Sequence, residues 1–546
     1  MKASDLLVRA LENEGVEVIF GVPGEENLDF LESLRTSSIE FVVTRHEQAA
    51  GFMAATWGRL KGKPGVCLST LGPGATNLTT AVAYALLGGM PMVCITGQKP
   101  IRQSKQGRFQ ILDVVRMMEP ITKFSTQIVD GNLIPRLVRE CFRVAHEEKP
   151  GPVHLELPED VAGEEVDRVP FEVTEVIPPA ASETALHEAA SMIAAAERPL
   201  VCIAAGANRD KTLGVLEDFI DSSGLYFVTT QMGKGAIDER HPRYLGTTAL
   251  SSGDYTHDGL DAADVVLMIG HDLSEKPPFF MERGGKKVIH LDEDQAEVDD
   301  LYFPQLEVLG CTAANTRALA DLVSPSPHWK TDYFERVRAA WRKHVLEAPA
   351  PETFPLVPQR VVREVRAALP SDAIVCLDNG MYKIWFARSY PAHMPNTLLL
   401  DNALASMGAG LPAAIGAKFA HPERQAVAIC GDGGFMMNSQ ELETAVRHEL
   451  NLGVVVLRDD AFGMIRWKQE ADGFEDYGLT FGNPDFVKYA ESYGAKGHRV
   501  TSVGGLSAAL KGCCEHGGVH LIEVAVDYSE NQRVLIDELE NRKRVE

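Results

Sequence analysis

The chain has 546 residues, and its 77 acidic residues outnumber its 53 basic residues, which gives a formal net charge of −24. A protein that binds nucleic-acid phosphates nonspecifically needs a basic surface, so this balance argues against such a role. Apolar residues make up 45% of the chain and charged residues 24%, as in soluble globular proteins. At about 100 to 200 residues per domain, the length predicts three or four domains.

The sequence contains no run of 18 or more apolar residues, so we expect no membrane-spanning helix. Charges interrupt the first ten residues, which argues against a signal peptide. None of the nine cysteines belongs to a C-x-x-C pair, and we expect four within apolar runs to be buried: Cys67, Cys94, Cys376 and Cys430. These features predict reduced thiols and a cytoplasmic protein.

Short apolar runs alternate with helical patterns along the chain, which predicts an α/β fold of three doubly wound, parallel-sheet domains. The first set of expected strands covers residues 18–22, 41–44, 66–69, 92–96 and 153–157. The second set covers residues 200–204, 226–229, 265–269 and 288–291. The third set covers residues 374–377, 397–400, 426–430, 454–457 and 519–526.

Stretches rich in proline and alanine separate the three sets, at residues 176–182 and from 324–327 to 348–351. We therefore predict domains at residues 1–175, 183–325 and 353–530. The charged tail, 531–546, is expected to be ordered only in part, at an interface. The first and third sets both place glycine turns at strand ends, but their sequences are too different to indicate a duplication.

The most informative stretch is residues 431–463, a strand end, a helical pattern and a second strand end. Asp432 and Asp459 follow the two strands, and the carboxyl ends of parallel strands meet at one edge of a sheet. Mg²⁺ prefers such oxygen ligands, and Gly433 and Gly434 allow a phosphate to approach the backbone. The plain alternative is an ordinary strand–turn–helix with an aspartate cap.

This stretch resembles the diphosphate-binding motif of thiamine-diphosphate (ThDP) enzymes. The resemblance implies that Asp432, Asp459 and the backbone carbonyl of Ala461 hold Mg²⁺. The family often has asparagine where this chain has Asp459, and either side chain offers an oxygen. The cofactor-binding residues that it implies in the same motif are Gly431, Asp432, Gly433 and Gly434.

Residues 41–50 resemble the segment that carries the catalytic glutamate of the same family, which implies that Glu47 is catalytic and binds the cofactor. A carboxyl group hydrogen-bonded to the pyrimidine ring favours the tautomer that activates ThDP. Burial would raise the pKa of such a carboxyl group. Considered alone, Glu47 would be interpreted as a surface glutamate or the start of a helix.

Several other segments resemble acetolactate and acetohydroxyacid synthases, over nearly the whole chain. Residues 21–24 and 69–77 resemble turns of the first domain, and residues 407–417 precede the metal motif. There Met407 would support the bent form of ThDP, whereas a lone methionine would normally indicate core packing. Further cofactor-binding residues implied by these segments are Pro23, Gly24, Asn77, Gly380, Met381 and Tyr382.

The chain resembles the catabolic branch of this family, which does not use FAD, more than it resembles the biosynthetic branch. Residues 270–278 lack the arginines of the flavin-dependent branch, residues 204–207 replace its glycine triplet, and residues 378–385 are closer to the catabolic pattern. In contrast, Phe109-Gln110 resembles a sequence segment of the biosynthetic branch. This resemblance makes Gln110 a second catalytic candidate. Trp467 lies one position before the place where the biosynthetic enzymes carry a tryptophan that shapes the substrate pocket.

We therefore predict an acetolactate synthase that uses ThDP and Mg²⁺ without FAD, acts on pyruvate, and forms homodimers or homotetramers with active sites at the subunit interface. Another ThDP-dependent 2-keto-acid decarboxylase or carboligase is the main alternative. Glu47 argues against a glyoxylate carboligase, which lacks this glutamate. A noncatalytic ThDP-fold subunit conflicts with intact Glu47, Asp432 and Asp459, and an NAD-binding protein conflicts with the missing G-x-G-x-x-G.

Overall fold

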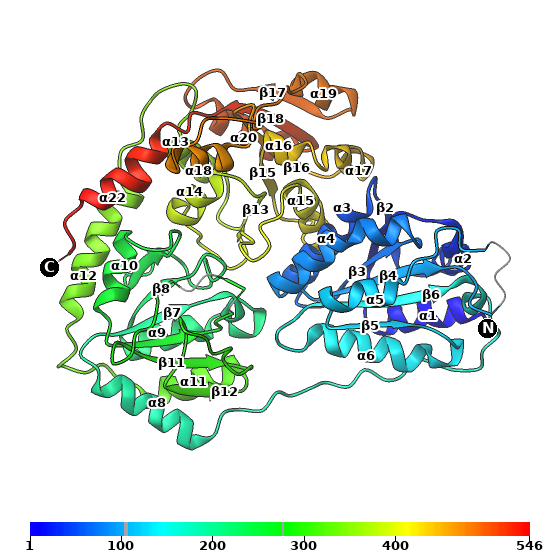
Figure 1. Ribbon diagram of the computed structural model, residues 1–546, viewed down its shortest axis with the longest axis horizontal. Coiled ribbons are helices and arrows are strands. Elements are labelled where there is room, and N and C mark those ends of the chain that lie inside the picture. Colours follow the sequence, from blue (N-terminus) through cyan, green and yellow to red (C-terminus); the bar gives the residue numbers. More distant parts are fainter. Residues whose placement is uncertain (103–106, 273, 276–277, 546) are drawn as a thin grey trace. The chain divides into compact units, whose positions relative to one another are not determined.

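The computed structural model describes residues 1–102, 107–272, 274–275 and 278–545. It contains three six-stranded sheets with helices packed on them, as Figure 1 shows. Strand pairings are parallel in all three sheets, for example β1 (Val18–Gly21) with β2 (Glu40–Val43). The predicted α/β fold with three parallel-sheet domains is therefore confirmed.

The chain divides into two compact units. The first comprises Met1–Val176 together with Ala403–Glu423 and Phe435–Leu452. The second comprises Ile177–Asn402, Arg424–Gly434 and Gly453–Glu546. Two segments of the predicted third domain thus group with the N-terminal sheet, and the domain boundaries drawn from the linkers remain predictions.

The first sheet has the strand order β2-β1-β3-β4-β6-β5. Its remaining strands are β3 (Gly65–Ser69), β4 (Met92–Gln98), β5 (Phe124–Gln127) and β6 (Pro152–Pro158). Its helices are α1 (Ala3–Asn13), α2 (Leu28–Leu34), α3 (Glu47–Lys61), α4 (Pro73–Gly88), α5 (Val114–Met118), α6 (Ile134–His146) and α7 (Glu159–Ala162). Every residue of β3, β4 and β6 is buried, as expected for strands covered on both faces.

Helix α15 (Gly410–Ala420) packs directly against α3 within the first unit. The contact is close because Gly416 lacks a side chain. A Cβ atom there would lie 2.5 Å from the backbone oxygen of Met53. Glycine at position 416 therefore sets how closely the two helices approach.

The central sheet has the order β12-β11-β10-β7-β8-β9. Its strands are β7 (Pro199–Ile203), β8 (Tyr226–Thr229), β9 (Tyr244–Thr247), β10 (Val265–Ile269), β11 (Lys287–Asp292) and β12 (Leu306–Leu309). Its helices are α8 (Glu183–Ala195), α9 (Val215–Ser223), α10 (Tyr255–Ala262), α11 (Thr312–Leu322) and α12 (Thr331–Trp341). Alternate residues of β7 enter two separate hydrophobic cores, Val201 one and Leu200 the other, so the sheet is covered on both faces.

The third sheet has the order β14-β13-β15-β16-β18-β17. Its strands are β13 (Ile374–Leu377), β14 (Leu398–Leu399), β15 (Ala426–Gly431), β16 (Leu452–Arg458), β17 (Lys496–Arg499) and β18 (Val519–Ala525). The other helices of this part of the chain are α13 (Pro358–Ala368), α14 (Tyr382–Ser389), α16 (Asp432–Phe435), α17 (Leu442–Arg447), α18 (Gly463–Ala471), α19 (Phe486–Ser492) and α20 (Gly505–His516).

We expected the C-terminal tail to be ordered only in part, at an interface. In the structure most of the tail is helical. Residues 530–541 are helical, in α21 (Glu530–Gln532), the π-helix η8 (Arg533–Asp537) and α22 (Glu538–Asn541). Arg542 then donates two hydrogen bonds, of 2.6 and 2.8 Å, to buried Asp258 in α10. Its guanidinium group also lies 4.7 Å from the centre of the Tyr255 ring. The tail is therefore ordered by contacts within its own chain.

Each expected strand is present, although the ends shift by up to a few residues. Four strands were not expected: β5, β9, β12 and β17. Cys67, Cys94, Cys376 and Cys430 are buried, as predicted. Among the described residues, no helix is long and apolar enough to cross a membrane.

Candidate active site

Two aspartates meet at the carboxyl edge of the third sheet, where β13, β15 and β16 are neighbours. Asp432 follows β15 as the first residue of α16, and Asp459 follows β16. Asp432 is 1% exposed, and its carboxyl group interacts directly with that of Asp459. The structure thus brings together the two carboxylates that the strand pattern places at one sheet edge.

The electrostatics of this pair fit a divalent cation. Burial, followed by the negative charge of Asp432, raises the pKa of Asp459 to about 7. Burial also raises the pKa of Asp432. A cation between the carboxylates would remove their mutual repulsion, and hard oxygen donors suit Mg²⁺.

Backbone and side-chain donors fix the orientation of Asp432. Its Oδ1 accepts a hydrogen bond from the Gly433 amide at 2.9 Å. Its Oδ2 accepts from the Asp460 amide and from Nδ2 of Asn483, each at 2.8 Å. Asn483 belongs to no recognisable motif, and sequence analysis missed it.

The turn after β15 leaves room only for glycine. A Cβ atom on Gly434 would lie 2.4 Å from Oδ2 of Asp378, the residue after β13. A Cβ atom on Gly433 would lie 3.0 Å from the Phe462 ring. The backbone of this turn, which carries no side chain at Gly433 and Gly434, therefore forms a cradle that suits a phosphate group.

The side chain of Tyr382 supports the same turn. Its hydroxyl accepts a hydrogen bond from the Gly431 amide at 3.0 Å, and its ring lies 2.5 Å from the position of a Cβ on Gly380. Burial raises the pKa of Tyr382 well above its ordinary value, so the phenol stays neutral. Met381 is 2% exposed and packs in the core, so its side chain is structural.

Ala461 lies two residues beyond Asp459, where it forms an isolated antiparallel bridge with Thr480. Among the described residues, no group of three or more His, Cys, Asp or Glu side chains is arranged to hold a metal ion. The predicted Mg²⁺ site needs no such group, because it consists of two carboxylates and the Ala461 carbonyl.

The second cluster of predicted residues surrounds Glu47 in the first unit. Glu47 is the first residue of α3 and is 9% exposed. Its Oε2 accepts a hydrogen bond from Nδ2 of Asn77 at 2.9 Å. Gly74 lies alongside, since a Cβ atom there would be 3.3 Å from Oε1 of Glu47. The predicted catalytic carboxyl group is thus nearly buried and held by one predicted partner.

A further carboxylate holds the turn before Glu47. Glu441 is fully buried, and its two carboxyl oxygens accept from the Arg45 amide at 3.0 and 3.3 Å. Burial raises the pKa of Glu441 to about 7. Sequence analysis missed this residue, because the contact joins positions 396 residues apart.

The other predicted residues of the first unit lie in loops. Pro23 and Gly24 follow β1, and a Cβ atom on Gly24 would lie 2.3 Å from the Cβ of Thr70. Gln110 is exposed and has a positive φ of 57°, and its backbone oxygen packs against Gly72. Met407 is half-buried in the loop before α15.

The predicted site residues therefore form two groups. Those of the first unit are Pro23, Gly24, Glu47, Asn77, Gln110 and Met407. Those of the second unit are Gly380, Met381, Tyr382, Gly431, Asp432, Gly433, Gly434, Asp459 and Ala461.

Comparison with known proteins identifies the family. Residues 1–117 match the N-terminal TPP binding domain of thiamine pyrophosphate enzymes, residues 186–319 the central domain, and residues 378–524 the C-terminal TPP binding domain. The chain is 33% identical to acetolactate synthase of Bacillus subtilis (strain 168), over 98% of this chain and 95% of that protein. The chain belongs to the ThDP-dependent acetolactate synthase family.

Other relatives within this family are similar to the chain over comparable lengths. A probable acetolactate synthase large subunit of Methanocaldococcus jannaschii is 33% identical, over 97% of this chain and 93% of that protein. Acetolactate synthase isozyme 1 large subunit of Escherichia coli (strain K12) is 31% identical, over 96% and 94%. Because the matches span nearly whole chains, all three domains share in the similarity.

In this member of the family, the central sheet has tightly packed loops at its topological switch point, between β7 and β10. The Gly206 amide donates a hydrogen bond to the Gly270 oxygen at 2.8 Å. A Cβ atom on Gly270 would lie 2.1 Å from the backbone nitrogen of Ala207. Dinucleotides bind at such a switch point in related folds, and here the two loops pack on each other. Leu273, Lys276 and Pro277 of the adjoining segment lie outside the described residues.

Proposed function

We propose that the chain is an acetolactate synthase that joins two molecules of pyruvate, with release of CO₂, to give 2-acetolactate. The observation that carries this proposal is the pair of interacting carboxylates, Asp432 and Asp459, beside a glycine turn at neighbouring strand ends. The carboxylate pair suits the metal, and the glycine turn suits the diphosphate of the family's cofactor. Relatives that match over nearly their full length carry the name acetolactate synthase.

In this proposal, Asp432, Asp459 and the Ala461 carbonyl would hold Mg²⁺, and the backbone of residues 431–434 would bind the diphosphate. When bound, ThDP supplies an electron sink for the decarboxylation of a 2-keto acid. Tyr382 supports the turn through the Gly431 amide, and Asn483 keeps Asp432 oriented.

Glu47 would face the pyrimidine end of the cofactor, where its carboxyl group would hold or release a proton. Burial and the hydrogen bond from Asn77 hold its carboxyl group in one orientation. Met407 would provide an apolar support for the cofactor, and Pro23 and Gly24 would help to bind it. Gln110 would orient a substrate or intermediate. Glu441 acts as a positioning residue, because it holds the Arg45 amide two residues before Glu47.

We also propose that this enzyme works without FAD. The close packing of residues 206 and 270 supports this proposal, because dinucleotides in related folds bind at the switch point where these two loops meet. A flavin spectrum of the purified protein tests it. Stoichiometric yellow flavin that copurifies with the chain would contradict it.

We further propose a homodimer or homotetramer in which the Glu47 cluster of one chain and the Asp432 cluster of another act on the same cofactor. A mixture of Glu47→Gln and Asp432→Ala chains, unfolded and refolded together, tests this assembly. Mixed dimers should recover activity, because one of their two sites carries no substitution. A fully active monomer in sedimentation experiments would contradict the proposal.

The decisive experiment for the activity is an assay with pyruvate, ThDP and Mg²⁺ on protein purified without added flavin. Acetolactate and acetaldehyde are both quantified. Acetolactate as the main product supports the proposal. Acetaldehyde as the main product would instead assign a ThDP-dependent decarboxylase, and turnover of other 2-keto acids alone would assign another carboligase.

A further inference from the structure

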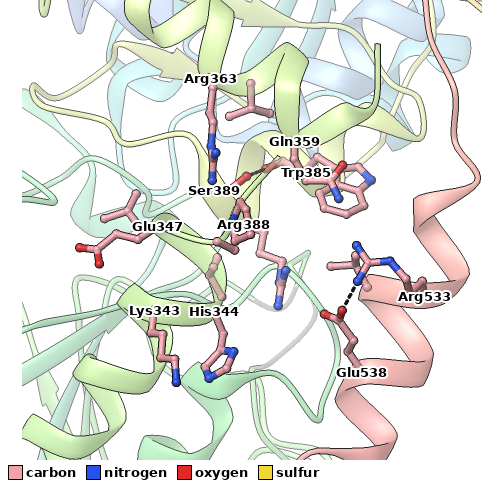
Figure 2. Close-up of a pocket in the computed structure, with 16 residues that line it drawn as sticks. Lys343, His344, Glu347, Gln359, Arg363, Trp385, Arg388, Ser389, Arg533 and Glu538 are labelled. Atoms are coloured by element: carbon pink, nitrogen blue, oxygen red, sulfur yellow. Dashed lines mark hydrogen bonds and ion pairs between the residues drawn. The ribbon is translucent and has the colours of Figure 1, made fainter. Parts of the chain in front are cut away.

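A cavity in the second unit lies among residues to which no role has been assigned. It has a volume of about 540 Å³, which is within the range of small-molecule sites. Its walls come from the segment 343–349, from α13 and α14, and from the first residues of η8 and α22. Figure 2 shows Lys343 and His344 on one side and Arg533 and Glu538 on another.

The lining is basic, although the whole chain carries a net charge of −24. Its acidic side chains are Glu347 and Glu538, and its lysine and arginine side chains are Lys343, Arg363, Arg388 and Arg533. The cavity lining therefore has more basic than acidic side chains, whereas the whole chain is acidic.

Two of these cations already have carboxylate partners. Arg388 donates hydrogen bonds of 2.6 and 2.9 Å to Asp254, and both side chains are buried. Arg533 pairs with Glu530 and Glu538, the latter marked in Figure 2. These interactions build the wall: the Arg388–Asp254 pair is neutral, and Arg533 with its two carboxylates carries one net negative charge.

The other two cations, Lys343 and Arg363, have no carboxylate partner among the described residues. Arg363 is half-buried, and burial and then the neighbouring Arg360 lower its pKa, so its charge lies in unfavourable surroundings. Lys343 is exposed and therefore accessible from solvent. The cavity thus presents two cations without an ion-pair partner in the described structure to whatever enters it.

Apolar side chains complete the walls. Leu346, Val362 and Val534 line the cavity, and Trp385 is held by a hydrogen bond of 2.9 Å from its Nε1 to Asn531. The volume exceeds what a bare inorganic ion needs. A ligand with a carbon skeleton would bury apolar surface against these residues.

We propose that this cavity binds a small organic dianion, either a phosphate monoester or a dicarboxylate, through Lys343 and Arg363. Two negative charges would balance the two unpaired cations, and a guanidinium group bonds both anions well. None of the residues that line the cavity belongs to the predicted cofactor site. Helix α14 contributes to both places, because Tyr382 begins this helix and Trp385 and Arg388 line the cavity. This inference does not depend on the proposed reaction.

Calorimetric titration of the full-length protein tests the proposal, with ThDP and Mg²⁺ at saturation so that the cofactor site is filled. The probes are AMP for a phosphate monoester and succinate for a dicarboxylate. We expect one probe to bind once per chain, and Arg363→Ala and Lys343→Ala each to weaken its binding by about tenfold. Arg363→Lys, which keeps the charge, should weaken it less than Arg363→Ala does.

The matched control is Lys511→Ala, which removes an exposed cation from α20 outside the cavity. It should leave binding unchanged. Tighter binding of AMP would identify the ligand class as phosphate monoesters. Tighter binding of succinate would identify it as dicarboxylates. Absence of binding by both probes, or binding that neither cavity variant weakens, would overturn the proposal. Because the readout is binding, a failed pyruvate assay would leave this result standing.

Discussion

The first and third sheets have the same strand order but carry different chemistry. In each, the first strand in sequence lies between the second and the third, and the last two strands exchange places at the far edge. The loop after the second strand carries Glu47 in the first sheet and Met407 in the third. The turn after the third strand is Pro73-Gly74 in one and Asp432-Gly433 in the other.

The two clusters differ in how their carboxyl groups are held. Glu47 has a hydrogen bond from Asn77 and no carboxylate against it in the described structure. Asp432 and Asp459 lie against each other, which raises the pKa of Asp459 to about 7. The strand order determines where the loops lie, and the residue types in those loops determine which ligand each can hold.

The largest effect is expected when the carboxylate pair is broken. Asp432→Ala removes a proposed metal ligand and the acceptor for donors from Gly433, Asp460 and Asn483. We expect pyruvate turnover to fall by about 1,000-fold and ThDP binding to be lost with it. Steady-state kinetics and fluorescence titration with ThDP measure the two effects. Glu491→Ala, an exposed acid in α19, serves as the control.

Glu47→Gln should separate turnover from cofactor binding. The amide keeps the size of the side chain but cannot exchange a proton, so we expect turnover to fall by about 100-fold. ThDP affinity should stay within about threefold, because the diphosphate end is intact. Glu17→Gln, an exposed substitution in the same unit, is the control. Full activity of the Glu47→Gln protein would remove Glu47 from the catalytic assignment.

A smaller effect is expected at Asn77, which acts through Glu47. Asn77→Ala removes the 2.9 Å hydrogen bond and should lower kcat by about tenfold. The same change in a Glu47→Gln background should have little further effect, since the interaction is already altered. Thr79→Ala in the same helix is the control. Equal losses in both backgrounds would show that Asn77 acts independently of Glu47.

The smallest effect is expected in the pH dependence of stability at Glu441. Its folded-state pKa of about 7 is above its ordinary value, so its contribution to stability is lost as the pH rises through 7. Between pH 6 and pH 8 the loss is about 1 kcal/mol. Glu441→Gln should flatten this part of the profile, and Glu443→Gln should not. Denaturant unfolding at each pH measures the difference, and identical slopes would contradict the assignment.

The strands that could be predicted from the sequence are mainly those in the middle of the sheets. Interior strands such as β4 and β15 are buried on both faces and therefore appear as apolar runs. The missed strands, β5, β9, β12 and β17, all lie at sheet edges. β17 has the sequence KGHR and is exposed at both ends, so it lacks an apolar signal. Edge strands depend on a neighbour for pairing, which the local sequence does not reveal.

A similar limit applies to the candidate site. Asp432 and Asp459 could be placed together from the sequence, because each follows a recognisable strand and parallel strand ends converge. Asn483 and Glu441 could not, because their contacts depend on how loops return to the sheet over 51 and 396 residues. The function of a loop residue is visible in the sequence only when a strand end fixes its position.

The contact between Arg542 and Asp258 has a consequence for synthesis of the chain. The two residues are 284 positions apart, and Asp258 is 3% exposed beneath the arginine. At about 5 to 20 residues per second, a ribosome makes Arg542 roughly 15 to 60 s after Asp258. During that interval Asp258 and the Tyr255 ring remain without their partner. The central sheet can form early in translation, but its outer surface is completed only after the third sheet has been synthesised.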